Sequence, residues 1–326
     1  MRARLVVALA AALAASLPFA AVQAQTAWPD KTVKIVVPYP AGPGTSDRMA
    51  RVLGEKLSKQ LGQPFIVDNR PGASGNLGSD FVAKAVADGS TLLLSAIGPI
   101  AINPSLFKKL PFDVTKDLQP VAFVAEEPFA LVTSKASGAT TVKELIAKAK
   151  ARPDRFSFGS SGVGSGTHVA GELFQRAAGV EILHVPYKGG TATINDVVSG
   201  LVTMTFTSLP LAASFHEAGK LNVLAVTGAR RSALLPDVPT VAEAGVPGAQ
   251  FASWYGVFAP ARTPKPIVER INAQFQAALR DPEVTKNAED IGLRLRPMTV
   301  AEFSDFVKAE TARMQEVVRS ANITLD

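Results

Sequence analysis

This chain of 326 residues contains no cysteine. The absence excludes disulfide bonds, a lipid-anchored N-terminal cysteine, and cysteine ligand sets for zinc or iron–sulfur clusters. Its three histidines, His168, His184 and His216, lack the spacing of metal-binding motifs. We therefore expect neither a metal nor a cofactor, and the hydrophobic core must stabilise the fold without cross-links, which a chain of this length allows.

Charge patterning and catalytic signatures are also missing. The formal net charge is +6, but Lys and Arg are scattered, and no basic stripe with interleaved aromatic residues indicates nucleic acid binding. There is no G-x-S-x-G motif, and Ser105-Leu106-Phe107-Lys108 matches S-x-x-K without its companion motifs. We expect no catalytic residue, although an enzyme acting on a small organic acid stays open as an alternative.

The first residues have the pattern of a secretory signal peptide. Arg2 and Arg4 precede an uninterrupted apolar run over residues 5–15, and Val22-Gln23-Ala24 forms a small-residue cleavage site. The run is short for a membrane anchor, and no stop-transfer segment follows it. We expect residues 1–24 to be removed, with cleavage after Ala24, on export to the periplasm.

One construction is present twice: an apolar strand, a loop of small residues and an amphipathic helix. The copies are strand 33–37, loop 38–46 and a helix from Asp47, and strand 156–158, loop 159–166 and a helix from Thr167. A helix N-terminus has unpaired N–H groups and partial positive charge, and small residues let an anion approach them. Two such loops facing one another predict a binder of small carboxylates.

Other interpretations of the second loop remain. Its glycines do not fit the G-x-G-x-x-G dinucleotide fingerprint, and the loop would serve only as a flexible turn if no ligand approached it. Valine at Gly164 or Gly166 is expected to block a ligand from the backbone and to weaken binding. His168, in the first turn of the following helix, is either a ligand contact or a capping group.

Strands and helices alternate along the whole chain, which predicts an α/β fold with largely parallel sheets. Further strands are expected at 65–67, 91–94, 121–124, 130–132, 182–185, 203–206 and 221–226. Further helices are expected at 77–87, 141–151, 191–199, 212–218, 264–279 and 300–320. Ligands bind beyond the carboxyl ends of such strands, so the segments after 91–94 and 203–206 are expected to join the two Gly/Ser loops at one cleft.

A series of motifs follows in order from residue 28 to residue 256. They are Trp28-Pro29-Asp30-Lys31, Val36 to Gly42, Asp68 to Ala73, Ile102-Asn103-Pro104, Gly159 to Gly162, His168 to Glu172, Val185 to Gly189, Leu234 to Thr240 and Ser253 to Gly256. Each is weak alone, but together they resemble the periplasmic receptors of tripartite tricarboxylate transporters, the Bug-type receptors.

The resemblance implies a two-lobed periplasmic binding protein, class II, of the "Venus flytrap" type, with a parallel-rich sheet in each lobe. Residues 25–125 and 246–326 would form lobe 1 and residues 126–245 lobe 2, with the ligand cleft between them. The implied function is capture of a small organic carboxylate by a monomer and its delivery to integral membrane subunits of a transporter. A receptor that feeds a signalling partner is the alternative.

The resemblance also implies which residues clamp the ligand. The candidates are Tyr39, Ala41, Gly42, Gly44, Thr45, Ser95, Ile97, Ser160, Ser161, Gly164, Ser165, Thr167, His168, Thr207 and Ser208. The sequence departs from the family pattern at Pro43, which interrupts the usual glycine pair, and at Thr207, where an Asp is usual. A buried ammonium requires acceptors, preferably a carboxylate, so Thr207 predicts a ligand without an amine unless Glu126 or Glu127 reaches the cleft.

Overall fold

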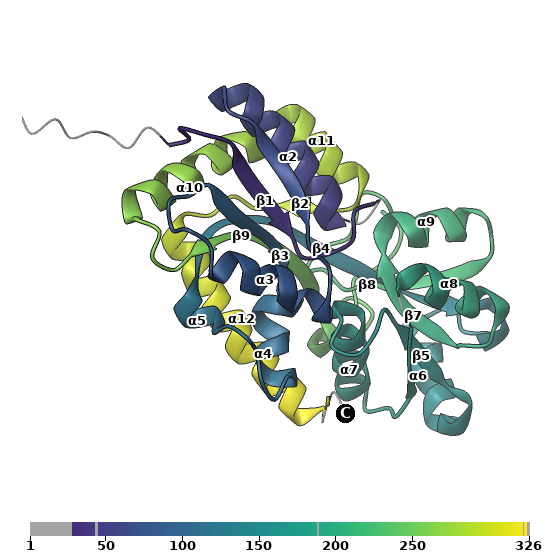
Figure 1. Ribbon diagram of the computed structural model, residues 1–326. Coiled ribbons are helices and arrows are strands. Elements are labelled where there is room, and N and C mark those ends of the chain that lie inside the picture. Colours follow the sequence, from purple (N-terminus) through teal and green to yellow (C-terminus); the bar gives the residue numbers. More distant parts are fainter. Residues whose placement is uncertain (1–27, 43–44, 188, 322, 325–326) are drawn as a thin grey trace, which may run out of the picture.

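The computed structural model describes residues 28–42, 45–187, 189–321 and 323–324 (Figure 1). The predicted signal peptide, its cleavage site after Ala24, and the candidate residue Gly44 lie outside these residues. Across the described ranges, no helix combines the length and the apolarity needed to cross a membrane.

One lobe is built on strands in the order β2-β1-β3-β9-β4. Its strands are β1 (Val33–Val37), β2 (Phe65–Asn69), β3 (Thr91–Ala96) and β9 (Ala252–Pro260), with the short β10 (Arg294–Leu295). One face packs on α2 (Thr45–Leu61), α10 (Lys265–Leu279) and α11 (Pro282–Asp290), and the other on α3 (Asn76–Ala83), α4 (Asn103–Leu106) and α12 (Val300–Ser320). A short α5 (Val114–Asp117) precedes β4. Because both faces are covered, β1 and β3 are apolar along nearly their whole length.

The other lobe has the strand order β8-β4-β7-β5-β6. Its strands are β5 (Ser157–Ser160), β6 (Leu183–Pro186), β7 (Met204–Ser208) and β8 (Leu221–Val226). Its helices are α6 (Val142–Ala151), α7 (Gly166–Ala178), α8 (Gly190–Ser199) and α9 (Leu209–Glu217). Figure 1 shows this lobe in teal and green beside the first.

The long strand β4 (Leu118–Ser134) belongs to both lobes. Its residues 118–128 pair with β9, and its residues 129–134 pair with β7 and β8. Strands β2-β1-β3 in one lobe and β7-β5-β6 in the other are parallel, whereas every antiparallel pairing involves β4 or β9. The predicted α/β, two-lobed fold with parallel strands in each lobe is therefore confirmed.

Several predicted elements need correction. Residues 121–124 and 130–132 are not separate strands but parts of β4, because the polar Glu126-Glu127 and Pro128 fall where the strand changes partners and not in a loop. Helix α3 ends at Ala83 and not at residue 87, and α11 was not predicted.

Strand β9 was also missed, although residues 252–260 are largely apolar. Gly256 lies in the middle of this segment, and glycine weakens strand interiors, so the sequence alone does not favour a strand here. In the structure this glycine is needed, since an added Cβ would lie 2.2 Å from the Phe303 ring of α12. Close packing of a helix on the strand therefore outweighs the local propensity.

Candidate functional site

Three segments, around Phe129, Thr227 and Phe251, are hydrogen-bonded to one another where β4 passes between the lobes. The Phe129 N–H donates to Thr227 Oγ1 (2.9 Å) and the Thr227 N–H donates to the Phe129 carbonyl (2.8 Å). The Phe251 N–H in turn donates to the Thr227 carbonyl (3.0 Å). Thr227 is fully buried, so these bonds make a candidate hinge. The lobe limits expected from the sequence, at 125/126 and 245/246, lie within six residues of Phe129 and Phe251 and stay a prediction.

The first Gly/Ser loop is tied to α2 by Asp47. This carboxylate accepts hydrogen bonds from the Gly42 N–H (3.2 Å), Asn69 Nδ2 (2.8 Å) and Arg51 Nε (2.9 Å). Asn69 Nδ2 also donates to the Tyr39 carbonyl (3.1 Å). The bond from Arg51 holds the pKa of Asp47 below its usual value. The loop is thus shaped by a charged network that begins in the first turn of α2.

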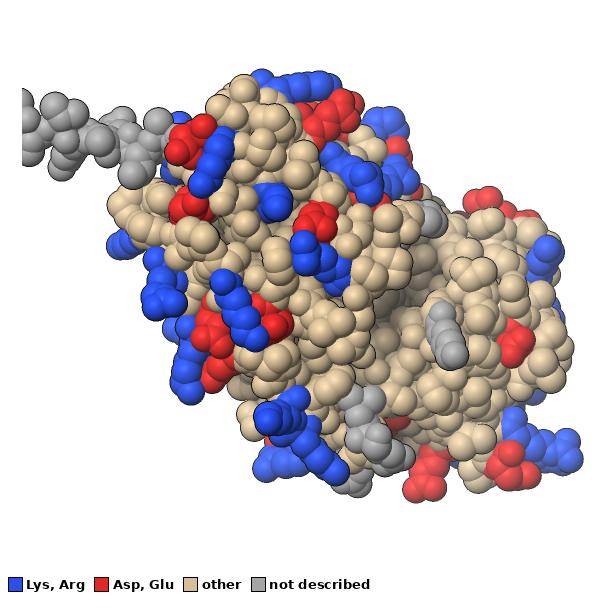
Figure 2. Space-filling view, viewed as in Figure 1, with Lys and Arg blue, Asp and Glu red and all other residues tan. Residues whose placement is uncertain are grey.

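The loops converge where β4 crosses between lobes. The hydroxyl of Thr45, the first residue of α2, donates a hydrogen bond to Glu127 Oε1 of β4 (3.0 Å). Phe129 follows Glu127 by two residues in β4, and an added Cβ at Gly166, the first residue of α7, would lie 3.3 Å from its ring. Ser208 of β7 pairs with the same Phe129. Figure 2 shows a hollow between the lobes whose visible wall consists mostly of residues other than Lys, Arg, Asp and Glu.

The last two residues of β3, Ser95 and Ala96, lie beside the first loop. Ala96 pairs with Tyr255 of β9, Ser95 is fully buried, and Tyr39 is half-buried. Burial raises the pKa of Tyr39, and hydrogen bonds with the Ala96 backbone and Ser95 partly offset this rise, so the phenol stays neutral. Ile97 points elsewhere: its side chain is 2% exposed and packs in the hydrophobic core.

Several amide groups of the second loop are already paired. The Ser161 N–H donates to Thr167 Oγ1 (2.9 Å), and the Gly164 N–H donates to His168 Nδ1 (3.1 Å). Ser165 is the N-cap of α7, since its hydroxyl accepts from the His168 N–H. Among the described residues, the N–H groups of Gly166 and Thr167 have no partner. The Val163 N–H of the same loop also has no partner within the described part of the chain. The amides open to an anion are therefore those of Val163 and of the first turn of α7.

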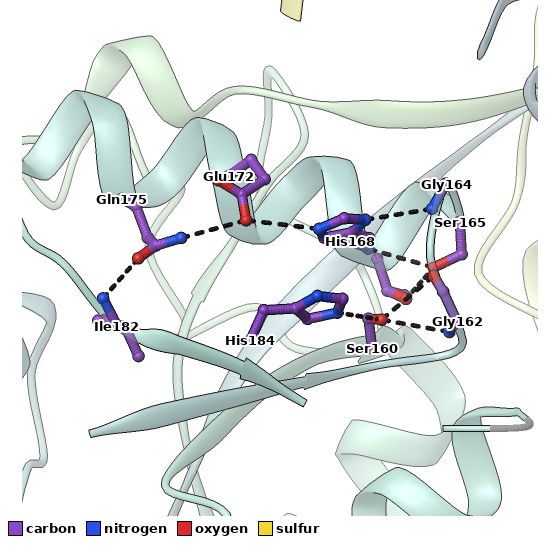
Figure 3. A network of polar contacts seen from close by, with 10 residues as sticks. Ser160, Gly162, Gly164, Ser165, His168, Glu172, Gln175, Ile182 and His184 are labelled. Atoms are coloured by element: carbon purple, nitrogen blue, oxygen red, sulfur yellow. Dashed lines mark hydrogen bonds and ion pairs between the residues drawn. The ribbon is translucent and has the colours of Figure 1, made fainter. Parts of the chain in front are cut away.

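His168 lies beside this loop and is hydrogen-bonded to it (Figure 3). Its Nδ1 accepts from Gly164, so the neutral ring carries its proton on Nε2, which lies 3.4 Å from Glu172 Oε1. The ring stacks on His184 with centroids 3.8 Å apart and an interplanar angle of 9°. His184 Nε2 lies 2.7 Å from Ser160 Oγ, at the end of β5. The two histidines thus brace both ends of the loop.

We expect His168→Ala to destabilise the protein by about 1–3 kcal/mol, because the buried Gly164 N–H would lose its acceptor. Urea unfolding at pH 7 measures the change. His216→Ala is the matched control, since His216 is exposed on α9. Equal unfolding curves for both variants would show that the His168 ring does not hold the loop.

Glu127 was not among the predicted site residues. The residue is only 8% exposed, and its carboxyl accepts hydrogen bonds from the Thr45 and Tyr255 hydroxyls. Burial raises the pKa of Glu127, and the bonds from Tyr255 and Thr45 oppose that rise. The neighbouring Glu126 is different, because it pairs with Arg296 (2.9 Å) and Arg294 (3.8 Å). From the sequence, Glu126 and Glu127 could be named only as two acids either of which could reach the cleft, and nothing in the sequence distinguished them.

The arrangement suits recognition of an anion by neutral groups. The candidate residues include no Lys or Arg, whereas two helix N-termini and several hydroxyls converge on one segment of β4. Within the described residues, no group of three or more His, Asp or Glu side chains is placed to hold a metal ion. Thr207 is buried opposite Ala130 in the ladder, near the same crossing.

Comparison with protein families finds a match over residues 49–323 to the tripartite tricarboxylate transporter family receptor. The chain is 36% identical over 299 residues to Protein BugT of Bordetella pertussis, which covers 91% of each chain. The matched family is described as one of receptors, and a further similar structure, 30% identical with a TM-score of 0.78, is of the periplasmic binding protein BugD, covering 91% of this chain and 100% of that one.

Two solved structures are similar over most of the chain. R. palustris Rpa4515 with adipate is 39% identical with a TM-score of 0.82, covering 91% of this chain and 100% of that one. MatC of Rhodopseudomonas palustris with bound malate is 32% identical with a TM-score of 0.77, covering 89% and 100%.

Proposed function

Because this chain belongs to the tripartite tricarboxylate transporter receptor family, we propose that it is a periplasmic receptor for a small organic carboxylate. One observation carries the proposal: the N-termini of α2 and α7 meet β4 two residues apart, at Glu127 and Phe129. A carboxylate at this crossing can accept from the free amides of Gly166 and Thr167 and from hydroxyls of either lobe.

The bound relatives support this choice of ligand. Rpa4515 holds adipate and MatC holds malate, both small dicarboxylates, on the same fold. A charge-assisted hydrogen bond contributes about 1.5–3 kcal/mol, so four to six of them can exceed the roughly 4–15 kcal/mol cost of association. We expect dissociation constants in the micromolar to nanomolar range, which correspond to binding free energies of about −8 to −12 kcal/mol.

The partner is proposed from the family. Delivery to integral membrane subunits of a tripartite transporter is the role that the family name describes, and export with cleavage after Ala24 would place the protein where such subunits are reached. A signalling partner is the second candidate. Pull-down of the ligand-loaded protein with solubilised transporter subunits tests the first role; binding to a sensor protein alone would favour the second.

We expect adipate or malate to bind at least ten times more tightly than the corresponding diamide. The reason is that a neutral amide forfeits at least one charge-assisted bond of about 1.5–3 kcal/mol and gains nothing from the helix dipoles. Isothermal titration of a panel of organic acids and their amides measures the ratio. Equal affinity of an acid and its amide would contradict an anion site.

A further inference from the structure

Glu127 is an unusual neighbour for a bound anion. The residue is 8% exposed, and its carboxyl lies beside the first residue of α2 and accepts hydrogen bonds from the Thr45 and Tyr255 hydroxyls. No Lys or Arg is among these partners. An ionised carboxylate at this point would repel the carboxylate of the ligand, and a protonated carboxyl would not.

We propose that Glu127 is a positioning residue that couples carboxylate binding to the uptake of one proton, by setting the direction in which the Thr45 hydroxyl points. The inference rests on the proposed carboxylate function. When Glu127 is ionised, the Thr45 hydroxyl donates to Oε1 (3.0 Å) and presents only lone pairs to the cleft. When Glu127 is protonated, its own O–H donates to Thr45 Oγ1, and the Thr45 hydrogen is free to bond a ligand carboxylate.

Among the titratable groups that the structure describes around Glu127, none competes with it for the proton. Tyr255 on β9 and Tyr39 on the first loop face it, and burial raises the pKa of both phenols, so they stay neutral. On α2 the charged Asp47 is already paired with Arg51. Burial likewise raises the pKa of Glu127, although the hydrogen bonds from Tyr255 and Thr45 oppose the rise, so its carboxyl takes up a proton more readily than an exposed glutamate does.

The charged groups on and next to β10 form ion pairs with Glu126 and not with Glu127. Arg294 and Arg296 pair with Glu126, which precedes Glu127 in β4. Successive side chains of a strand point to opposite faces, so Glu126 and Glu127 differ in environment although they are adjacent. This pair therefore provides a matched control within the chain.

The test is the affinity of adipate and malate as a function of pH, from about pH 7 to 9, where both ligands are almost fully ionised. The wild type should weaken by up to about tenfold per pH unit in the upper part of this range, which is the slope for uptake of one proton. Titration calorimetry in two buffers of different ionisation enthalpy should show up to one proton taken up per ligand.

Three variants separate the roles. Glu127→Gln should bind independently of pH and without proton uptake, because its amide can accept from Tyr255 and donate to Thr45, as the protonated acid does. Glu126→Gln should keep the wild-type pH profile. Thr45→Val should bind weakly and lose most of the pH dependence, whereas Thr45→Ser, which keeps the hydroxyl, should restore both.

The outcomes are distinguishable from failure of the proposed function. If no organic acid of the panel binds the wild type at any pH, the carboxylate function itself is wrong. If carboxylates bind with a flat pH profile and no proton uptake, or if Glu127→Gln keeps the wild-type profile, the coupling is overturned and the carboxylate function stands. Tight binding of aspartate but not malate, without proton uptake, would also overturn it, because Glu127 would then serve as an ionised partner for an ammonium group. The number of protons taken up per bound ligand is measured on the wild type, so this part of the test does not depend on whether any variant folds.

Discussion

Gly164→Val should destabilise the protein by about 2–5 kcal/mol and weaken ligand binding. Gly164 has a φ of +74°, which costs a residue with a Cβ about 1–2 kcal/mol, and more for a branched one. An added Cβ would also lie 2.3 Å from Leu106 Cδ1 of α4, in the opposite lobe. Because Leu106 is buried in the core, relieving this overlap costs about a further 1–3 kcal/mol.

The reason for this effect differs from the one that the sequence suggests. Valine was expected to block a ligand from the backbone, but the Gly164 N–H already donates to His168. Weaker binding is now expected because the second loop can no longer pack against α4 in the same position. Gly166→Val should be milder in its effect on stability, since Gly166 has no positive φ and its Cβ would lie 3.3 Å from Phe129.

Gly219→Val is the control for backbone strain alone. Gly219 has a similar φ of +66°, with no atom within 4 Å of an added Cβ. Urea unfolding should show a smaller loss for this variant than for Gly164→Val, and Leu106→Ala should partly rescue the latter. Equal losses at both glycines would show that contact with Leu106 contributes nothing.

Much of the fold could be predicted because its signals are local. Strand β1 and helices α2, α7 and α12 have strong apolar periodicity, and the structure places them within two residues of the expected limits. Strands β4 and β9 are long-range features. Their continuity across the lobes depends on pairing partners more than 70 residues away, which no local pattern records.

The candidate site shows the same division. Small residues and helix starts marked both loops, and Thr45 and Ser165 lie at the N-termini of α2 and α7 as expected. The sequence did not indicate that His168 and His184 stack, because they are 16 positions apart and meet only through β6 and α7. Nor did it select Glu127, whose importance comes from burial beside Thr45.

The stacked histidines give the last prediction: stability should fall as the pH is lowered from about 6.5 to 4. Burial, reinforced by the neighbouring His168, lowers the pKa of His184 to about 4 from an ordinary value of 6.5. The folded state therefore prefers the neutral ring, and its advantage is complete above pH 6.5, where both folded and unfolded chains are neutral. It is lost as the pH falls, because the unfolded chain takes up the proton first.

A shift of this size corresponds to about 2–3 kcal/mol, at about 1.36 kcal/mol per pKa unit and with allowance for partial exposure. Urea unfolding of the wild type and of His184→Gln between pH 7.5 and 4 should show this difference accumulating as the pH falls, because glutamine does not titrate. The pKa of Asp88 and of Asp113 is about 2 in the folded protein, so these carboxyls do not take up protons there between pH 7.5 and 4. Every titratable group except His184 is present in both proteins, so the difference between the two stability curves reports His184. The exposed His216→Gln should follow the wild type. Parallel stability curves for wild type and His184→Gln would mean that His184 accepts a proton in the folded protein as readily as in the unfolded chain.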